Sequence, residues 1–158
     1  MTDTQDTFEG LSESLLQGIA DLGWRDPMPV QAKVIPLMQT GKDLIVQAQT
    51  GSGKTGAFGI PLIETMNLEI NATQALIMTP TRELASQVES EIAALARHTG
   101  VRSLAVYGGV GYGPQLEGLQ KGAHIVVGTP GRILDHLGSG RMNLDELRVL
   151  IMDEADEM

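Results

Sequence analysis

Apolar residues near the start of the chain recur at the spacing of one helical face. They are Leu11, Leu15, Leu16, Ile19 and Leu22. Gly23 follows and provides a stop signal for this helix. A second short helix is predicted to open at Pro29, because proline fits the first position of a helix. Residues 1–7 are polar, and we expect them to be frayed.

Further along, the pattern changes to short apolar runs that alternate with helical stretches. The runs are Asp43–Ala48, Ala75–Met78, Val101–Tyr107, Ile125–Val127 and Arg148–Met152. The helical stretches lie at about residues 55–66, 81–97, 115–120 and 131–137. Runs without polar alternation, each separated by a helix, are typical of a parallel sheet with helices on both faces. The predicted fold class is therefore α/β.

Each apolar run is followed by a polar or glycine-rich segment. In chain order these segments read QTGSGKT at 49–55, TPTRE at 79–83, YGG at 107–109, GTPGR at 128–132 and DEAD at 153–156. Ligands of such sheets bind beyond the carboxyl ends of the strands. The sequence therefore predicts that its unusual chemistry gathers at one edge of one sheet.

The segment after the first run has the pattern of a phosphate-binding loop. It consists of Ala48, Gln49, Thr50, Gly51, Ser52, Gly53, Lys54 and Thr55. The pattern G-x-x-x-x-G-K-[ST] is matched, except that Ala48 replaces the first glycine. Gly51 and Gly53 allow backbone N–H groups to point at an anion, and the following helix adds its positive end. We expect Lys54 to contact the β- and γ-phosphates and Thr55 to ligate Mg²⁺; a plain flexible turn is the alternative.

An acidic pair, Asp153 and Glu154, follows the last apolar run. Next to a bound nucleotide, Asp153 would hold Mg²⁺ through water, and Glu154 would orient or deprotonate the attacking water. Mg²⁺ suits such a site because it keeps most of its waters and needs few protein oxygens. On its own, an acidic pair at a strand end is more often solvated surface. The phosphate loop upstream favours the catalytic interpretation.

Taken together, the motifs resemble those of DEAD-box ATP-dependent RNA helicases. The motifs are Gly23–Gln31 with Phe8 upstream (the Q motif), the phosphate loop, Pro80–Ala85 (motif Ia), Gly108–Gly109 (the GG element), Thr129–Arg132 (motif Ib) and Asp153–Asp156 (the DEAD tetrapeptide). They cover the chain from Phe8 onward. The resemblance implies an N-terminal RecA-like P-loop NTPase domain over residues 1–158, incomplete at its C-terminus, with a Q-motif region at about 8–36.

The resemblance also implies roles for single residues around the nucleotide. Gln31 is expected to read the Watson–Crick edge of adenine and to select ATP over GTP. Trp24 stands where the family usually has Phe or Tyr, so its ring is expected to stack on adenine; simple packing is the alternative. Phe8 is expected to pack rather than to contact the ligand. Asp156 is expected to couple the ATP site to the next motif.

A further set matches family positions that grip the sugar-phosphate backbone of RNA: Thr81, Arg82, Gly109, Thr129 and Arg132. Arginine forks, hydroxyls and loop N–H groups suit contacts that do not read sequence. For Arg82 alone, a salt bridge with Glu83 or Glu89 at a helix start is an equal alternative. Tyr107 and Tyr112 flank the GG element, and we expect packing rather than stacking on RNA.

The implied function is the ATP- and RNA-binding half of an ATP-dependent RNA helicase that uses ATP and Mg²⁺. RNA and a second RecA-like domain of the same parent chain are the implied partners. The family's Ser-Ala-Thr motif and that second domain, which supplies arginine fingers, do not occur in the 158 residues. An arginine finger contributes on the order of 10³–10⁵ in rate, so we expect the chain alone to bind nucleotide, to hydrolyse it slowly or not at all, and to unwind no duplex. The alternatives are a binding module without turnover, or another P-loop ATPase such as a DNA helicase or a transporter subunit.

The net charge of the chain limits the kind of surface that could bind RNA. The formal net charge is −9, which argues against a broad basic surface for nucleic acid. Acidic residues concentrate in residues 1–26 and 143–158, and the middle of the chain is near neutral. RNA contact must therefore depend on a few placed arginines and backbone amides.

The remaining composition indicates the compartment in which we expect the protein. The chain has no cysteine, which excludes disulfides and thiolate metal sites and fits a reducing cytoplasm. It has no apolar stretch long enough to span a membrane and no secretory signal at its start, so we expect a cytoplasmic protein without membrane contact. His98, His124 and His136 lack metal-ligand spacing and are expected on the surface or in packing. The oligomeric state stays open.

Overall fold

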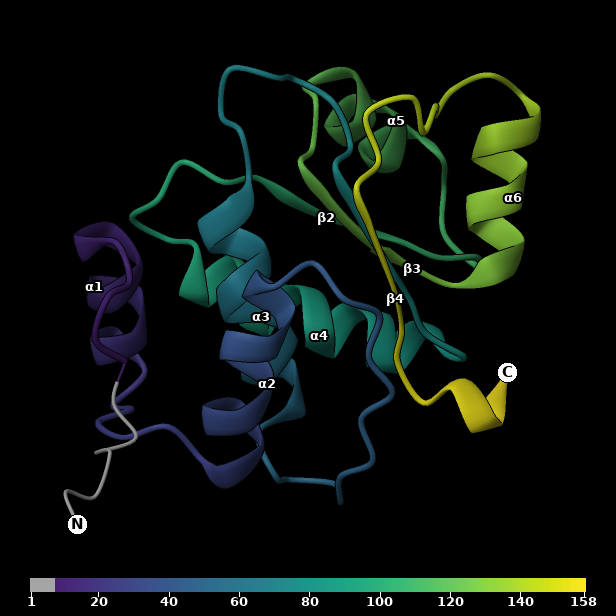
Figure 1. The fold of residues 1–158 in the computed structure, drawn as a ribbon. Coiled ribbons are helices and arrows are strands. Elements are labelled where there is room, and N and C mark those ends of the chain that lie inside the picture. Colours follow the sequence, from purple (N-terminus) through teal and green to yellow (C-terminus); the bar gives the residue numbers. More distant parts are fainter. Residues whose placement is uncertain (1–7) are drawn as a thin grey trace, which may run out of the picture. The chain divides into compact units, whose positions relative to one another are not determined.

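The computed structural model describes residues 8–158, so the expectation for residues 1–7 lies outside the described residues. The chain divides into two compact units, and Figure 1 labels most of their helices and strands. The first unit comprises the chain up to Thr65 together with Ala94–Thr99, and the second comprises Met66–Ala93 and Gly100–Met158. None of the helices in the described part is long and apolar enough to cross a membrane.

The first unit holds the helices of the N-terminal part, α1 (Glu13–Asp21), α2 (Pro29–Gln39) and α3 (Lys54–Thr65). α1 buries Leu15 and Ile19, and it ends before Gly23, whose φ of 75° is one that glycine adopts without strain. Ser12 donates from its backbone N and from its Oγ to the Glu64 carboxylate, at 2.8 Å each. These bonds link the start of α1 to the end of α3. Both helices predicted at the start of the chain are confirmed.

The prediction that the first apolar run forms a strand is wrong. Asp43–Ala48 has no regular secondary structure, and the side chains of Ile45 and Val46 are exposed, that of Ile45 completely. A strand exists through hydrogen bonds to a neighbouring strand, and within residues 8–158 no strand pairs with this run. An apolar run is therefore not sufficient for a strand when its partner is absent.

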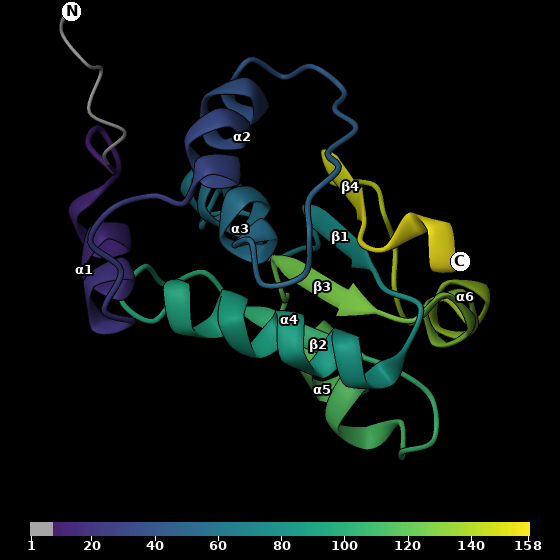
Figure 2. The ribbon, with the colours of Figure 1, turned by 90° about the horizontal axis from the view of Figure 1, so that it is seen from below.

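The second unit contains a parallel sheet and the helices that connect its strands. Its elements are β1 (Ala75–Met78), α4 (Arg82–Leu95), β2 (Ser103–Val106), α5 (Gly113–Gln120), β3 (Ile125–Gly128), α6 (Pro130–Gly138), β4 (Val149–Met152) and the 3₁₀ helix η1 (Ala155–Glu157). The last residues of α4, from Ala94 on, cluster with the first unit. The strand order is β2-β3-β1-β4, and every neighbouring pair is parallel (Figure 2). The four later apolar runs are thus confirmed as strands of an α/β fold.

Helices cover both faces of this sheet. Successive side chains of a strand point to opposite faces, and Ser103 and Leu104 of β2 meet different helices. Ser103 Oγ donates to Glu89 Oε1 of α4 at 2.7 Å, whereas Leu104 Cδ1 would lie 2.5 Å from a Cβ added to Gly118 of α5. The second face also carries a buried cluster, formed by Leu76, Val106, Ala123, Val126, Ile133 and Met142. The predicted cover on both faces is confirmed.

β4 lies at one edge of the sheet and pairs only with β1 among the described strands. Asp153 N, just beyond β4, donates to Met78 O of β1 at 2.9 Å. Since alternate residues of a parallel strand bond the same neighbour, the backbone groups of Leu150 and Met152 face away from β1. Their side chains are 53% and 58% exposed. β4 therefore presents an apolar, unpaired edge.

Gly18 of α1 packs closely against the end of α4. A Cβ added at Gly18 would lie 2.2 Å from Leu95 O, and a backbone carbonyl cannot move aside as a flexible side chain can. We expect Gly18→Ala to lower the free energy of unfolding by about 1–3 kcal/mol, despite the better helix propensity of alanine. Urea unfolding followed by circular dichroism measures this change. Gly138→Ala in α6 is the control, since nothing lies within 4 Å of a Cβ there; equal stability of the two variants would contradict the prediction.

Candidate functional site

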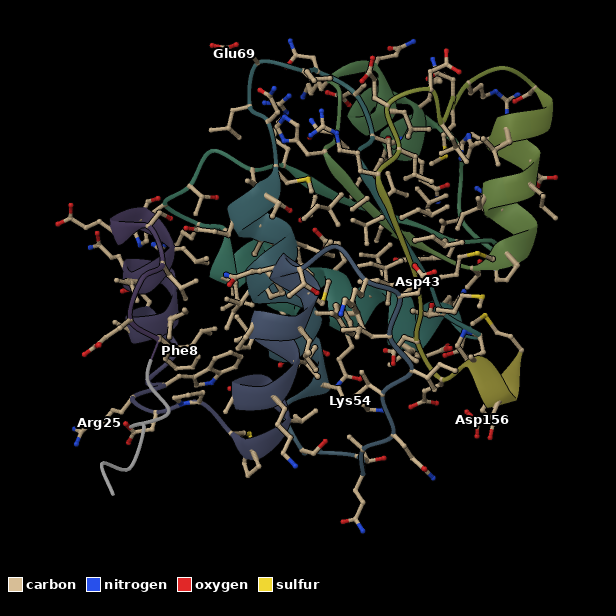
Figure 3. The ribbon with its side chains drawn as sticks, in the orientation of Figure 1. Phe8, Arg25, Asp43, Lys54, Glu69 and Asp156 are labelled. Atoms are coloured by element: carbon tan, nitrogen blue, oxygen red, sulfur yellow. The ribbon has the colours of Figure 1, made fainter. Side chains whose placement is uncertain are left out.

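The predicted phosphate loop makes a tight turn directly before α3. Gly51 and Gly53 have φ values of 78° and 88°, and Ser52 N donates to Gln49 O. α3 begins at Lys54, so the loop ends at the positive end of a helix (Figure 3). Ser52 Oγ is buried and has no hydrogen-bond partner in the described part of the chain. These features fit a phosphate group, which would accept hydrogen bonds from that hydroxyl and from the N–H groups of the helix start.

The glutamine of the Q motif lies against this loop. Gln31 is buried; its Oε1 accepts from Met28 N at 2.9 Å, and its Nε2 donates to Gly53 O at 3.2 Å. A side-chain amide has two N–H donors and two acceptor lone pairs. One donor and one acceptor of Gln31 therefore remain, which is the pair that adenine requires. The Q motif and the phosphate loop, separate in sequence, are in contact.

The aromatic residues of the N-terminal part are packed. Trp24 is partly buried, and a Cβ added to Gly56 of α3 would lie 2.8 Å from its Cζ3. Gly56 therefore makes room for the indole ring, and the ring packs against α3, as the packing alternative for Trp24 predicted. Stacking of the ring on adenine stays a prediction. Phe8 is 7% exposed, so its expected packing role is confirmed.

The carboxyl ends of the strands in the second unit lie side by side. The last residue of β1, Met78, is in register with Gly128 of β3 and with Met152 of β4, and Val106 of β2 is in register with Gly128. Motif Ia, the GG element, motif Ib and the DEAD tetrapeptide follow these residues directly. The predicted gathering at one sheet edge is confirmed for these four motifs. The phosphate loop belongs to the other unit and follows a run that forms no strand.

Three of the candidate RNA contacts lie at this edge. Thr81 Oγ1 accepts from Leu84 N at 3.1 Å and so caps α4. Arg82 lies beside the GG element, because a Cβ added at Gly109 would be 2.9 Å from Arg82 Nη1. Arg82 Nε also meets Glu83 Oε1 at 3.3 Å, but both side chains are more than half exposed, and such pairs contribute little to stability.

An open hollow of about 380 Å³ lies beside the start of α4. It is lined by Arg82, Glu83, Ser86, Tyr107 and Val110.

The two candidates of motif Ib are held in different ways. Thr129 N donates to Val106 O at 3.0 Å, which fixes the turn after β3. Arg132 is 8% exposed; its Nη2 donates to Val110 O at 3.0 Å, and its guanidinium carbon lies 4.0 Å from the centroid of the Tyr112 ring. Arg132 therefore anchors the loop that contains Val110, in addition to being a candidate RNA contact. The Tyr112 ring, which is 40% exposed, packs against Arg132 as expected, and the absence of stacking on RNA stays a prediction.

The DEAD tetrapeptide forms the turn that follows β4. Asp153 is 9% exposed, which is unusual for a carboxylate without a function or a partner. Glu154 has a φ of 50°, the only positive φ of a non-glycine residue among residues 8–158, and such strain concentrates at functional sites. Asp156 is exposed on η1 (Figure 3). Residues 8–158 hold no cluster of three or more side chains suited to bind a metal ion directly.

The three histidines have the surface and packing roles expected for them. His98 is partly exposed, and its Nε2 lies 2.6 Å from Asp21 Oδ2. His124 and His136 are completely buried. His136 Nδ1 has no hydrogen-bond partner among the described residues, so a proton on that nitrogen would lack an acceptor.

The buried histidines should make the stability of the chain depend on pH. Burial lowers the pKa of both imidazoles below the ordinary 6.5, and nearby arginines lower it further: Arg102 at His124, and Arg132 and Arg141 at His136. Well above pH 6.5 the imidazoles are neutral in both states, so their contribution to the stability is complete; as the pH falls through 6.5, the unfolded chain takes up these protons first and stability is lost. Urea unfolding at about pH 7.5 and about pH 5 measures the loss. His124→Gln should flatten the pH dependence, and an unchanged slope would contradict the prediction.

Sequence reasoning missed one residue of this region, Gln115. It is buried in α5 and bonds to Tyr107, Arg132 and His136. A single glutamine on a short helix carries no motif, so its role is visible only from its burial and its partners.

Comparisons with known proteins agree on one family. Residues 28–158 match the family described as DEAD/DEAH box helicase. The chain is 47% identical over 154 residues to the DEAD-box ATP-dependent RNA helicase CshA of Geobacillus kaustophilus, an alignment that covers 96% of this chain and 33% of that protein. It is 46% identical over 161 residues to the ATP-dependent RNA helicase DeaD of Buchnera aphidicola, covering 100% of this chain and 27% of that protein.

The solved structures agree with the sequence relatives. The crystal structure of a DEAD box protein from the hyperthermophile Methanococcus jannaschii matches with a TM-score of 0.88 and 48% identity, over 96% of this chain and 42% of that one. The RecA-like α/β fold implied by the sequence is thus confirmed. The chain spans about a third of the length of the curated relatives it matches. Because the family match extends over most of its residues, the chain belongs to the DEAD/DEAH box helicase family.

Proposed function

We propose that this chain is the ATP- and RNA-binding part of an ATP-dependent RNA helicase. The relatives from Geobacillus kaustophilus and Buchnera aphidicola carry that activity in their names. The observation that carries the proposal is the bond from Gln31 Nε2 to Gly53 O. It sets an amide with one free donor and one free acceptor beside a phosphate loop, which is the combination required to select an adenine nucleotide.

In this proposal the phosphate loop and the Q motif bind ATP. The contacting residues are Trp24, Gln31, Ala48, Gln49, Thr50, Gly51, Ser52, Gly53, Lys54 and Thr55. The Ser52 hydroxyl, buried without a partner among the described residues, and the N–H groups at the start of α3 donate to the phosphates. Lys54 balances the charge of the β- and γ-phosphates, and Trp24 stacks on the adenine.

Hydrolysis would depend on Mg²⁺ and on the carboxylates after β4. The Thr55 hydroxyl would ligate the ion and Asp153 would hold it through water, a mode of binding that needs no dense cluster of protein ligands. Mg²⁺ supplies positive charge to the phosphoryl oxygens. Glu154 orients or deprotonates the attacking water, and Asp156 couples the nucleotide site to the rest of the helicase.

RNA would bind at the carboxyl edge of the sheet in the second unit. Thr81, Arg82, Gly109, Thr129 and Arg132 would contact its sugar-phosphate backbone. The hollow beside Arg82 and Tyr107 can receive a backbone segment, and the exposed Arg82 guanidinium offers a fork for a phosphate. Contacts of this kind read the shape and the 2′-hydroxyls of RNA rather than its sequence. Unwinding would require a second RecA-like domain as partner.

The affinities for ATP and GTP in the presence of Mg²⁺ test the proposal. Fluorescence of a labelled nucleotide, displaced by each competitor, should show a clear preference of the chain for ATP. Guanine carries an acceptor where adenine carries an amino donor, so the amide of Gln31 cannot satisfy both bases. Equal affinities would instead favour another kind of P-loop ATPase.

Phosphate release separates the enzyme from a binding module. We expect the 158-residue chain to bind ATP and to release phosphate slowly or not at all, with or without RNA. The malachite-green assay measures this release. Steady RNA-stimulated turnover by the chain alone would contradict the expectation that a second domain is needed.

A further inference from the structure

Gln115 joins three segments of the second unit through its side-chain amide. Its Nε2 donates to Tyr107 O at 2.8 Å, and its Oε1 accepts from Arg132 Nη1 at 3.3 Å and lies 2.9 Å from His136 Nε2. The side chain is 4% exposed. Tyr107 immediately precedes the GG element, whereas Arg132 and His136 belong to α6.

The partners determine which way this amide points. Tyr107 O can only accept a hydrogen bond, so the NH₂ group of Gln115 must face it. The amide oxygen then faces Arg132, whose guanidinium can only donate. His136 Nε2 must therefore carry a proton and donate to the same oxygen, with Nδ1 unprotonated. The network is consistent in one arrangement of donors and acceptors only.

The same amide holds both sides of the GG element. On one side Gln115 bonds to Tyr107 O directly. On the other side Val110 O accepts from Arg132 Nη2 at 3.0 Å, and the guanidinium of Arg132 is bonded to Gln115 in turn. Between these attachments lie Gly108 and Gly109, which have little conformational preference of their own. Gly109 is held at a φ of 82°, beside Arg82.

We propose that Gln115 is a positioning residue that holds Gly108 and Gly109 in the conformation that binds RNA. This inference rests on the proposed RNA contacts of Arg82 and Gly109. Gln115 itself is buried and does not touch the RNA. It acts by ordering the loop before RNA arrives, because a loop that is ordered only on binding lowers the affinity by the entropy of that ordering.

Three variants of the full 158-residue chain test this role. Gln115→Met keeps the volume of the side chain and removes all of its hydrogen bonds. Gln115→Glu keeps the acceptor for Arg132 and His136, removes the donor to Tyr107 O and sets a carboxylate oxygen against that carbonyl. Gln120→Met is the matched control, since Gln120 is an exposed glutamine at the end of the same helix.

Two measurements apply to every variant. Amide ¹⁵N relaxation gives order parameters for Gly108 and Gly109, and anisotropy of a labelled single-stranded oligouridine of about ten nucleotides gives the RNA affinity. In the wild type and in Gln120→Met we expect order parameters near ~0.85, typical of a rigid backbone. In Gln115→Met we expect values below ~0.6 and an RNA affinity about tenfold lower, with ATP affinity unchanged. Gln115→Glu should loosen Gly108 more than Gly109 and weaken RNA binding less.

The outcomes separate this inference from the proposed function. Unchanged order parameters in Gln115→Met, or in Gln115→Glu if the first variant does not fold, would overturn the positioning role. A loosened loop with full RNA affinity would overturn its link to RNA binding. If the wild-type chain bound no RNA while Gly108 and Gly109 still loosened in the variants, the RNA-binding proposal would fail and the structural role of Gln115 would stand.

Discussion

Lys54→Ala should weaken ATP binding by about tenfold to a hundredfold, the largest effect expected of any single substitution in this chain. In the proposed ATP complex the ammonium group would meet the β- and γ-phosphates, and charge-assisted hydrogen bonds of this kind contribute about 1.5–3 kcal/mol each. The start of α3 remains, so some affinity for phosphate should survive. Titration with a fluorescent ATP analogue in the presence of Mg²⁺ measures the loss.

Lys42→Ala is the matched control for this experiment. Lys42 is an exposed lysine of the same unit and lies outside the phosphate loop. Removing its charge tests whether a general loss of positive potential weakens binding. If both variants lost affinity equally, the loop would not be the phosphate site.

Gln31→Glu should abolish the preference for ATP over GTP and lower ATP affinity about tenfold or more. A carboxylate can accept from Met28 N but cannot donate to Gly53 O, so it would set an anion against a carbonyl oxygen of the phosphate loop. The same change removes the donor that adenine requires. Competition between ATP and GTP for the labelled nucleotide measures both effects.

Gln39→Glu provides the comparison on the same helix. Gln39 is the exposed last residue of α2. Gln39→Glu therefore introduces the same chemical change on this helix, outside the phosphate loop. Its affinities should equal those of the wild type. An unaltered ratio of ATP to GTP affinity in Gln31→Glu would exclude Gln31 as the base-reading residue, and thermal unfolding of the variant would show whether the buried charge had disrupted the fold.

The strands of the second unit could be predicted from the sequence because each is a buried apolar run that finds a partner within the chain. Ala75–Met78 agrees at both ends with the predicted run. Asp43–Ala48 has the same kind of sequence and forms no strand, since no described strand pairs with it. Hydropathy reports the tendency of a segment to be buried, but a hydrogen-bonded ladder depends on a second segment that the pattern does not name.

Motifs predicted the loops and turns of the candidate site, but they did not predict the hydrogen bonds that hold these loops in place. The phosphate loop, the motif Ia turn and the DEAD turn could be predicted because glycines, charges and strand ends mark them. The attachment of Arg132 to Val110 O could not, because an arginine in a motif looks the same whether it is exposed or buried. Gln115 belongs to no motif, and its importance is visible only from its hydrogen bonds to Tyr107, Arg132 and His136.

The unpaired side of β4 is expected to make the chain self-associate at high concentration. Two molecules can each complete the other's ladder along Leu150 and Met152, and such encounters become more frequent with the square of the concentration. Affinities measured at high protein concentration would then describe dimers or early aggregates instead of the monomer. A lysine in place of Leu150 would put a charge where the two edges must approach, and light scattering at several dilutions would show whether it keeps the chain monodisperse.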